Sequence, residues 1–151
     1  MPQTSRLVSL YEGDFALWLE DVAAKLRSRD FDQLDIDNLV EEVEALGRSD
    51  KKEIKSRLVT LLAHLLKRLY IDSAYDNRGW EITIREQRKE LTLLLEQSPS
   101  LRGYFAEVFE AAYAIALAEV REDYAKVTFP NRWSLSQTVD DLLSQVYWVD
   151  S

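Results

Sequence analysis

The segment from Asp37 to Lys67 constrains the fold of this chain more than any other part of its sequence. Apolar side chains recur there at steps of three and four residues, which places them on one face of an α-helix. Gly47 is only a weak breaker, so we expect a continuous or mildly kinked helix, although Ser49 is a suitable cap for a second helix starting there. The apolar face consists of Leu39, Val43, Leu46, Ile54, Leu58, Leu61, Leu62, Leu65, Leu66 and Leu69.

A shorter amphipathic helix is predicted before this segment, over residues 15–29, with Asp14 as its N-cap. In the loop that follows it, Phe31 and Leu34 are expected to fold back onto the core. Either Asp35 or Asp37 is then expected to cap the long helix. The inner face of the shorter helix is expected to consist of Phe15, Trp18, Leu19, Val22 and Leu26.

Three helices are predicted after the long one, beyond a loop at residues 70–79 that is rich in Asp, Ser, Asn and Gly. The first begins at Trp80 and ends near residue 97. Ser98 followed by Pro99 predicts a stop and a restart, with the proline at the first position of a helix reaching residue 124. Ser134 or Ser136 is expected to cap a short last helix near residues 135–143. The predicted inner faces are Trp80, Ile84, Leu91, Leu94 and Leu95 in the first helix, and Phe105, Val108, Phe109, Ala112, Ala116 and Val120 in the second.

The predicted fold is all-α, an antiparallel bundle of four main helices plus a short C-terminal helix, forming one domain over residues 1–151. Four glycines and three prolines are too few for a turn-rich β-sandwich or barrel. The absence of cysteine excludes disulfides, thiolate zinc sites and a cysteine nucleophile. No run approaches the ~20 apolar residues that span a bilayer, and the N-terminus lacks signal-peptide features. We therefore expect a soluble cytoplasmic protein without membrane contact.

Charge is distributed unevenly along the chain, whose net charge is −8. Residues 1–47 carry four basic and eleven acidic side chains, residues 48–90 carry eleven and seven, and the remainder carries four and nine. The acidic balance argues against a general nucleic-acid binder, because neutralising phosphates needs a basic field. The banding fits either helix faces that pair within one fold or attraction between copies of the chain.

Several motifs carry a resemblance to a known family. They are Asp14-Phe15 with Trp18, DNLVEEVEALGRS (37–49), LLAHLLK (61–67), Trp80 with TIREQR (83–88), and SPSL (98–101). By these motifs the chain resembles the bacterial, mainly cyanobacterial, domain-of-unknown-function family number twenty-nine over about residues 11–143, followed by a C-terminal tail at 144–151. The resemblance implies an all-helical fold and brings no activity, substrate or cofactor. The sequence departs from the family pattern in two loops, at Tyr70-Ile71-Asp72 and at Arg132, where the family tends to have proline.

Polar side chains along the long helix form a first candidate site. The cluster consists of Glu41, Glu44, Arg48, Arg57 and His64, with Gln87 from the following helix. Because histidine titrates near neutrality, one interpretation is an anion or general-acid site around His64. The other is a histidine at the edge of the core, bonded to Gln87 or to a backbone carbonyl. We expect the second, since no acid or nucleophile stands at helical spacing from His64.

Neither a metal nor a cofactor is expected. A di-metal carboxylate site in a helical bundle needs Glu-x-x-His on two helices. Residue 61, three positions before His64, is leucine, and the chain has no second histidine. A mononuclear site would need His64 to approach Glu44 or Glu41, and on one straight helix His64 and Glu44 are about 30 Å apart.

A candidate partner surface is predicted from Arg85, Arg88, Tyr147 and Trp148. The arginines, near Trp80, resemble an RNA-binding patch, but acidic residues interleave with them and local ion pairs are the simpler account. Tyr147 and Trp148 lie near the end of the chain, where we expect them to be exposed. An exposed aromatic cluster is typical of a docking site.

Three functions stay open. The leading hypothesis is a non-enzymatic helical interaction or regulatory protein that binds itself or a protein partner. The alternative is a small enzyme or ligand-binding protein with a polar site near His64, and the second alternative is a nucleic-acid-associated factor using the basic middle region. For self-association, we expect residues 1–47 of one copy to meet residues 48–90 of another, with the terminal aromatics as an anchor. Salt should weaken such a contact.

Overall fold

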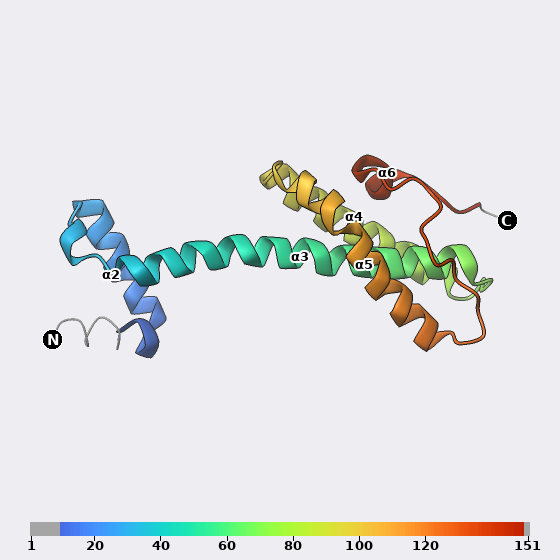
Figure 1. Cartoon of the computed structure of the whole chain (residues 1–151), viewed down its shortest axis with the longest axis horizontal. Helices are drawn as coiled ribbons and strands as arrows, with labels where there is room; N and C mark the ends of the chain where they lie inside the picture. Colours follow the sequence, from blue (N-terminus) through green and yellow to red (C-terminus); the bar gives the residue numbers. More distant parts are fainter. Residues whose placement is uncertain (1–9, 150–151) are drawn as a thin grey trace. The chain divides into compact units, whose positions relative to one another are not determined.

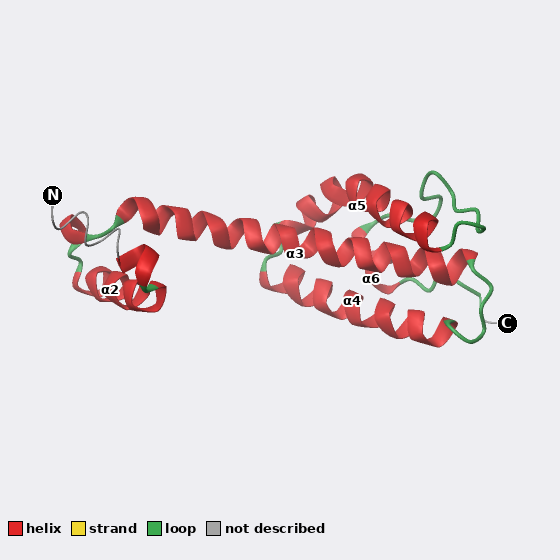
Figure 2. Cartoon of the chain, turned by 90° about the horizontal axis from the view of Figure 1, so that it is seen from below, coloured by secondary structure: helices red, strands yellow, loops and turns green. Residues whose placement is uncertain are grey.

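The computed structural model describes residues 10–149, and these residues are all-α, with no strand among them (Figure 2). The elements are α2 (Phe15–Ser28), the 3-10 helix η1 (Phe31–Gln33), α3 (Ile36–Tyr70), α4 (Asn77–Gln97), α5 (Leu101–Asp123) and α6 (Val139–Ser144) (Figure 1). The prediction of four long helices and a short C-terminal one is confirmed. Within the described range, no helix combines the length and apolar character that crossing a membrane requires.

Contacts divide the chain into two compact units, one ending at Arg48 and the other beginning at Ser49. We call the described part of the first, residues 10–48, the N-terminal unit, and that of the second, residues 49–149, the C-terminal unit. Helix α3 contributes residues to both. The expectation that the whole chain forms one domain stays a prediction.

Helix α3 is continuous over thirty-five residues, as the apolar register predicted (Figure 1). Gly47 lies inside it with helical backbone, and a Cβ at that position would meet nothing within 4 Å. The glycine therefore has no close approach to accommodate, and one weak helix former does not outweigh the register around it. The alternative of a fresh start at Ser49 is wrong.

The core of the C-terminal unit forms where α4 and α5 lie alongside the second half of α3 (Figure 2). Each helix contributes the apolar face that its period predicted. Ala112 and Ala116 of α5 are fully buried, and their small side chains are suited to close packing of helices. Helix α6 adds Leu142 to the same cluster. The fully buried larger side chains of this core include Ile54, Leu58, Leu61, Leu62, Leu65, Leu66, Ile84, Leu91, Phe105 and Phe109.

The N-terminal unit is organised around Trp18, which is fully buried. The Asp14 carboxylate accepts a hydrogen bond from the Leu17 amide at 3.1 Å, which confirms the predicted cap of α2. Trp18 Nε1 donates to the Asp35 carboxylate at 3.0 Å, and the Asn38 side chain donates to the same oxygen at 2.8 Å. Asp35 therefore ties the start of α3 to α2.

Several side chains that we expected in the core are exposed. Of the predicted inner face of α2, only Trp18 and Val22 are buried. Phe31 does not fold back onto a core and is 55% exposed. The physical reason is the size of the N-terminal unit, because so few elements cannot cover every apolar face that their periodicity provides. The other exposed members of the predicted faces are Phe15, Leu19, Leu26, Val43 and Leu46.

Three predicted helix boundaries are wrong by two to four residues. Helix α4 begins at Asn77, before Trp80, after a turn in which the Asp76 amide donates to the Ser73 hydroxyl. Pro99 lies in a turn closed by the bond from the Leu101 amide to the Ser98 carbonyl, so α5 begins only at Leu101. Helix α6 is capped by Thr138, whose hydroxyl accepts from the Asp141 amide at 3.2 Å, and neither Ser134 nor Ser136 caps it.

Truncating Leu62 tests the core of the C-terminal unit. Because this side chain is fully buried, Leu62→Ala should lower the free energy of unfolding by about 2–5 kcal/mol. Leu93→Ala, at a half-exposed position of α4, is the control and should change it by about 0.5 kcal/mol or less. Denaturant unfolding followed by circular dichroism measures both. Equal effects of the two substitutions would contradict the described core.

Candidate functional site

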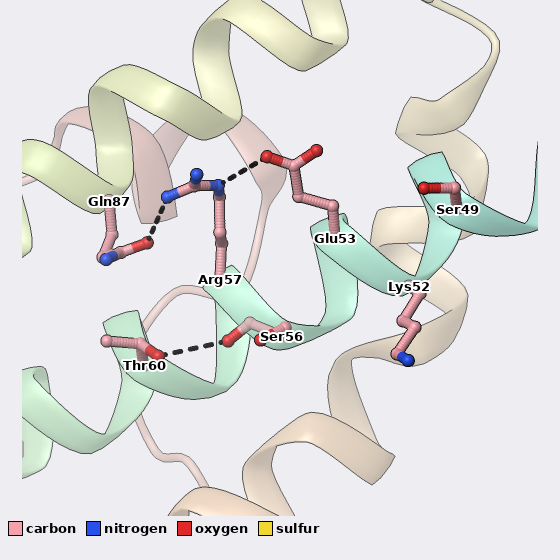
Figure 3. A pocket seen from close by; sticks show the side chains of 7 residues that line it. All are labelled: Ser49, Lys52, Glu53, Ser56, Arg57, Thr60 and Gln87. Carbon is pink, nitrogen blue, oxygen red and sulfur yellow. Dashed lines mark hydrogen bonds and ion pairs between the residues drawn. The ribbon is translucent and has the colours of Figure 1, made fainter. Parts of the chain in front are cut away.

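A polar pocket of about 430 Å³ lies in the C-terminal unit, along α3 between Ser49 and Thr60. Helix α4 borders it on one side (Figure 3). Six of its lining side chains come from α3, where steps of three and four residues bring them to neighbouring turns. The seventh comes from α4. The lining residues are Ser49, Lys52, Glu53, Ser56, Arg57, Thr60 and Gln87.

Arg57 is the centre of this pocket and links the two helices. Its Nε donates to the Glu53 carboxylate at 3.0 Å, and its Nη1 donates to the Gln87 side-chain oxygen at 3.2 Å (Figure 3). Its Nη2 lies 4.0 Å from the Glu90 carboxylate. An anionic ligand would have to compete with these carboxylates, so this arrangement is better suited to holding α3 against α4 than to binding an anion.

The hydroxyl and ammonium groups of the pocket do not converge on Arg57. The Thr60 hydroxyl donates to the Ser56 carbonyl of the preceding turn at 3.2 Å. Lys52 points away from the side on which Arg57 meets Gln87 (Figure 3). The Thr60 hydroxyl and the Lys52 ammonium therefore take no part in the contacts of Arg57.

His64 is half-buried and bonds within its own helix. Its Nδ1 lies 2.8 Å from the Thr60 carbonyl oxygen. Because a carbonyl oxygen only accepts, Nδ1 carries the proton and donates it. Burial lowers the pKa of His64 and Lys67 lowers it further, while the hydrogen bond to Thr60 and the charge of Glu119 oppose the shift. The expected bond to a backbone carbonyl is present, and Gln87, the other expected partner, bonds Arg57 instead.

The structure brings together two subsets of the predicted polar cluster. In the N-terminal unit, the Arg48 guanidinium lies 2.9 Å from the Glu41 carboxylate and 3.8 Å from that of Glu44. In the C-terminal unit, Arg57 meets Gln87, and His64 does not line their pocket. The residues described contain no group of three or more His, Cys, Asp or Glu side chains that could hold a metal ion. A ligand role for the cluster stays a prediction.

The predicted partner surface is largely engaged within the chain. Arg88 Nε donates to the Leu142 carbonyl at 2.8 Å and Nη2 to the Gln145 carbonyl at 2.6 Å, so Arg88 holds the end of α6. Burial lowers the pKa of this guanidinium. Only Arg85 is exposed as expected. Sequence reasoning missed the role of Arg88, because its partners lie more than fifty residues away and are backbone atoms.

The expectation that Tyr147 and Trp148 are exposed is wrong, since both are half-buried against the core. The Tyr147 hydroxyl donates to the Ser136 carbonyl at 2.8 Å, and its ring lies edge-on to Trp133 at 5.6 Å. Burial raises the pKa of Tyr147 to about 12, so this hydroxyl stays a donor at neutral pH. The Arg68 guanidinium lies 5.5 Å from the centre of the Trp148 ring. These aromatic rings are held by the core and do not project from it.

An exposed apolar stripe on α3 is the second candidate site. Ile36, Val40 and Val43 stand eighteen residues before Ile54, Leu58 and Leu61. Ile36, Val40 and Val43 follow one another at steps of four and three residues, so they lie on one face of α3 within the N-terminal unit, with the same spacing as the second set. The second set is fully buried, whereas Ile36, Val40 and Val43 are 52%, 48% and 60% exposed. We call these three residues, with the 70% exposed Leu46, the open stripe.

Sequence reasoning found Val43 and Leu46 of this stripe but placed them in the core, and it did not include Ile36 or Val40. The period of apolar side chains identifies a helix face, and it does not report whether another element covers that face. The ion pairs of Arg48 with Glu41 and Glu44 lie outside the stripe on the same helix. The open stripe is therefore apolar along its length and polar at its border, the arrangement typical of a protein contact surface.

Comparison with known proteins gives one match. The family model described as Domain of unknown function DUF29 matches residues 10–148. No curated protein and no solved structure matches the chain.

The lowered pKa of His64 predicts a pH dependence of stability. The unfolded chain binds this proton more readily than the folded one, so protonation favours unfolding. The contribution of His64 is present above the ordinary pKa of 6.5 and is lost as pH falls below it towards the lower folded value. The parent should therefore lose more stability on acidification through this range than His64→Gln, whose side chain does not titrate. Parallel losses in urea unfolding at each pH would contradict the prediction.

Removing the Arg88 guanidinium should loosen the end of the chain. Arg88→Met loses two charge-assisted hydrogen bonds to backbone carbonyls, an expected loss of about 1.5–3 kcal/mol. Hydrogen exchange of the amides in residues 145–149 should become faster. Arg85→Met, at the exposed position one turn earlier, is the control and should leave these exchange rates unchanged. Unchanged exchange in both variants would show that Arg88 does not hold this segment.

Proposed function

We propose that this chain, which belongs to the family described as Domain of unknown function DUF29, is a non-enzymatic helical interaction protein that binds protein through the open stripe. One observation carries the proposal. Ile36, Val40 and Val43 have the spacing of the fully buried Ile54, Leu58 and Leu61, but they are about half exposed. A large apolar side chain gains about 1.5–3 kcal/mol on full burial, so the uncovered face is a source of binding energy.

The alternatives have weaker support. A ligand-binding or enzymatic role near the polar pocket would need a free cation or a reactive pair, and Arg57 is engaged by Glu53 and Gln87. A nucleic-acid role would need a basic field, and the Arg57 guanidinium lies between two carboxylates, those of Glu53 and Glu90. We propose that the interaction takes place in the cytoplasm, a reducing compartment that a chain without cysteine fits.

Site-specific photo-crosslinking in the native host tests this function. A photoreactive amino acid at Val43 lies on the open stripe, and one at Glu41 lies on the opposite side of the same helix with similar exposure. Illumination should give discrete protein adducts from position 43, because a bound partner holds it at van der Waals distance. Position 41 should give none.

The contrast between the two positions decides the test. Adducts from both positions alike would indicate random collision, and their absence from position 43 would refute the proposed function. The circular dichroism spectrum of each purified variant checks that α3 is intact, which is expected because both side chains are exposed.

A further inference from the structure

We propose that the open stripe is covered by the open stripe of a second copy of this chain, the two helices running antiparallel. The inference rests on the proposed function and names the partner for it. Three observations carry it: the incomplete core of the N-terminal unit, the order of side chains along the stripe, and the positions of its charges.

The N-terminal unit lacks a core of the usual size. Within it, Trp18 and Val22 are the buried apolar side chains, while nine large apolar side chains between Phe15 and Leu46 are 42–70% exposed. The whole unit, Met1–Arg48, is short, and small units bury a small share of their apolar surface by themselves. The chain has no cysteine, and the described residues hold no group that could bind a metal. Apolar contact with another chain would cover these exposed side chains.

The order of side chains along the open stripe is self-complementary. In an antiparallel pair centred between Val40 and Val43, Val40 of one copy lies opposite Val43 of the other. In an antiparallel pair, a step back along one helix corresponds to an equal step forward along the other. Ile36, four residues before Val40, therefore lies opposite Leu46, three residues after Val43, at each end of the stripe. A two-fold axis makes every contact occur twice, so one short stripe supplies both halves of a closed interface.

The charges beside the stripe favour the antiparallel direction. Asp37 stands at the start of the stripe and Arg48 just beyond its end. The antiparallel order brings Arg48 of one copy to within about one helical turn of Asp37 of the other. A parallel pair would instead keep Asp37 of one copy about 16 Å along the helix axis from Arg48 of the other.

Salt should affect this self-association in the opposite direction to a contact between residues 1–47 of one copy and residues 48–90 of another. Such a contact between opposite charges would be weakened by salt. Residues 10–48 carry eleven acidic and four basic side chains, so two N-terminal units repel each other at long range. Salt screens this repulsion over about 8–10 Å and does not weaken apolar contact. Raising the salt concentration should therefore strengthen self-association.

Analytical ultracentrifugation of the purified full chain tests the second copy. A monomer–dimer equilibrium is expected, with the dimer favoured as salt rises. Val43→Glu should weaken dimerisation by about tenfold or more. Leu93→Glu places the same charge at a similarly exposed apolar position of α4, and it should leave the dimerisation constant unchanged. Equal effects of both substitutions, or dissociation by salt, would overturn the proposal.

Engineered cysteines test the direction, since the chain has none of its own. Mixing Ile36→Cys with Leu46→Cys under mild oxidation should give a disulfide-linked dimer of the two variants. Ile36→Cys alone should not crosslink, because the two copies of residue 36 would be about 15 Å apart along the helix axis. Rapid crosslinking of Ile36→Cys with itself would overturn the antiparallel arrangement.

The two proposals fail in distinguishable ways. A purified chain that stays monomeric at every protein and salt concentration overturns the second-copy proposal. If position 43 then still gives adducts with other proteins in the host, the proposed function stands and the partner is a different chain. If position 43 gives no adduct either, both proposals are overturned.

Discussion

Burial of one face of α3 by α4 and α5 is the interaction on which the C-terminal unit depends. Ile54, Leu58 and Leu61 are inaccessible to solvent because two neighbouring helices meet on that face. The polar contacts lie at the border of this core. Arg57 joins α3 to α4 through Gln87, and Arg88 joins α4 to the end of α6. Such bonds contribute modestly to stability, but they select one relative position of the helices among those that apolar packing allows.

The same spacing of apolar side chains on α3 has a different environment in each unit. Where it is covered, it is the core of a unit; where it is uncovered, it is a surface that water contacts at a free-energy cost. The N-terminal unit keeps its geometry through directed polar bonds, chiefly those that Trp18 and Asn38 donate to Asp35. Most of its large apolar side chains remain exposed. This combination leaves apolar surface available to a partner.

The sequence predicted local structure better than burial. The continuity of α3 and the inner faces of α4 and α5 follow from spacing along the chain, and each was confirmed. The exposure of Val43 and Leu46 could not be predicted in this way, because it depends on how much of the chain packs against them. The roles of Arg88 and Tyr147 were missed for a related reason: both bond backbone carbonyls that a loop and a short helix bring to them. Nothing in the residue types involved identifies such partners in advance.

Gly47 has a consequence for the mechanical behaviour of α3. A glycine inside a helix costs about 1 kcal/mol relative to alanine, and here its surroundings are open. The residues on either side of it, Leu46 and Arg48, are exposed as well. The turn around Gly47 is therefore less stable than it would be with alanine at this position. Local unwinding there would break few side-chain contacts, because the residues around Gly47 are exposed.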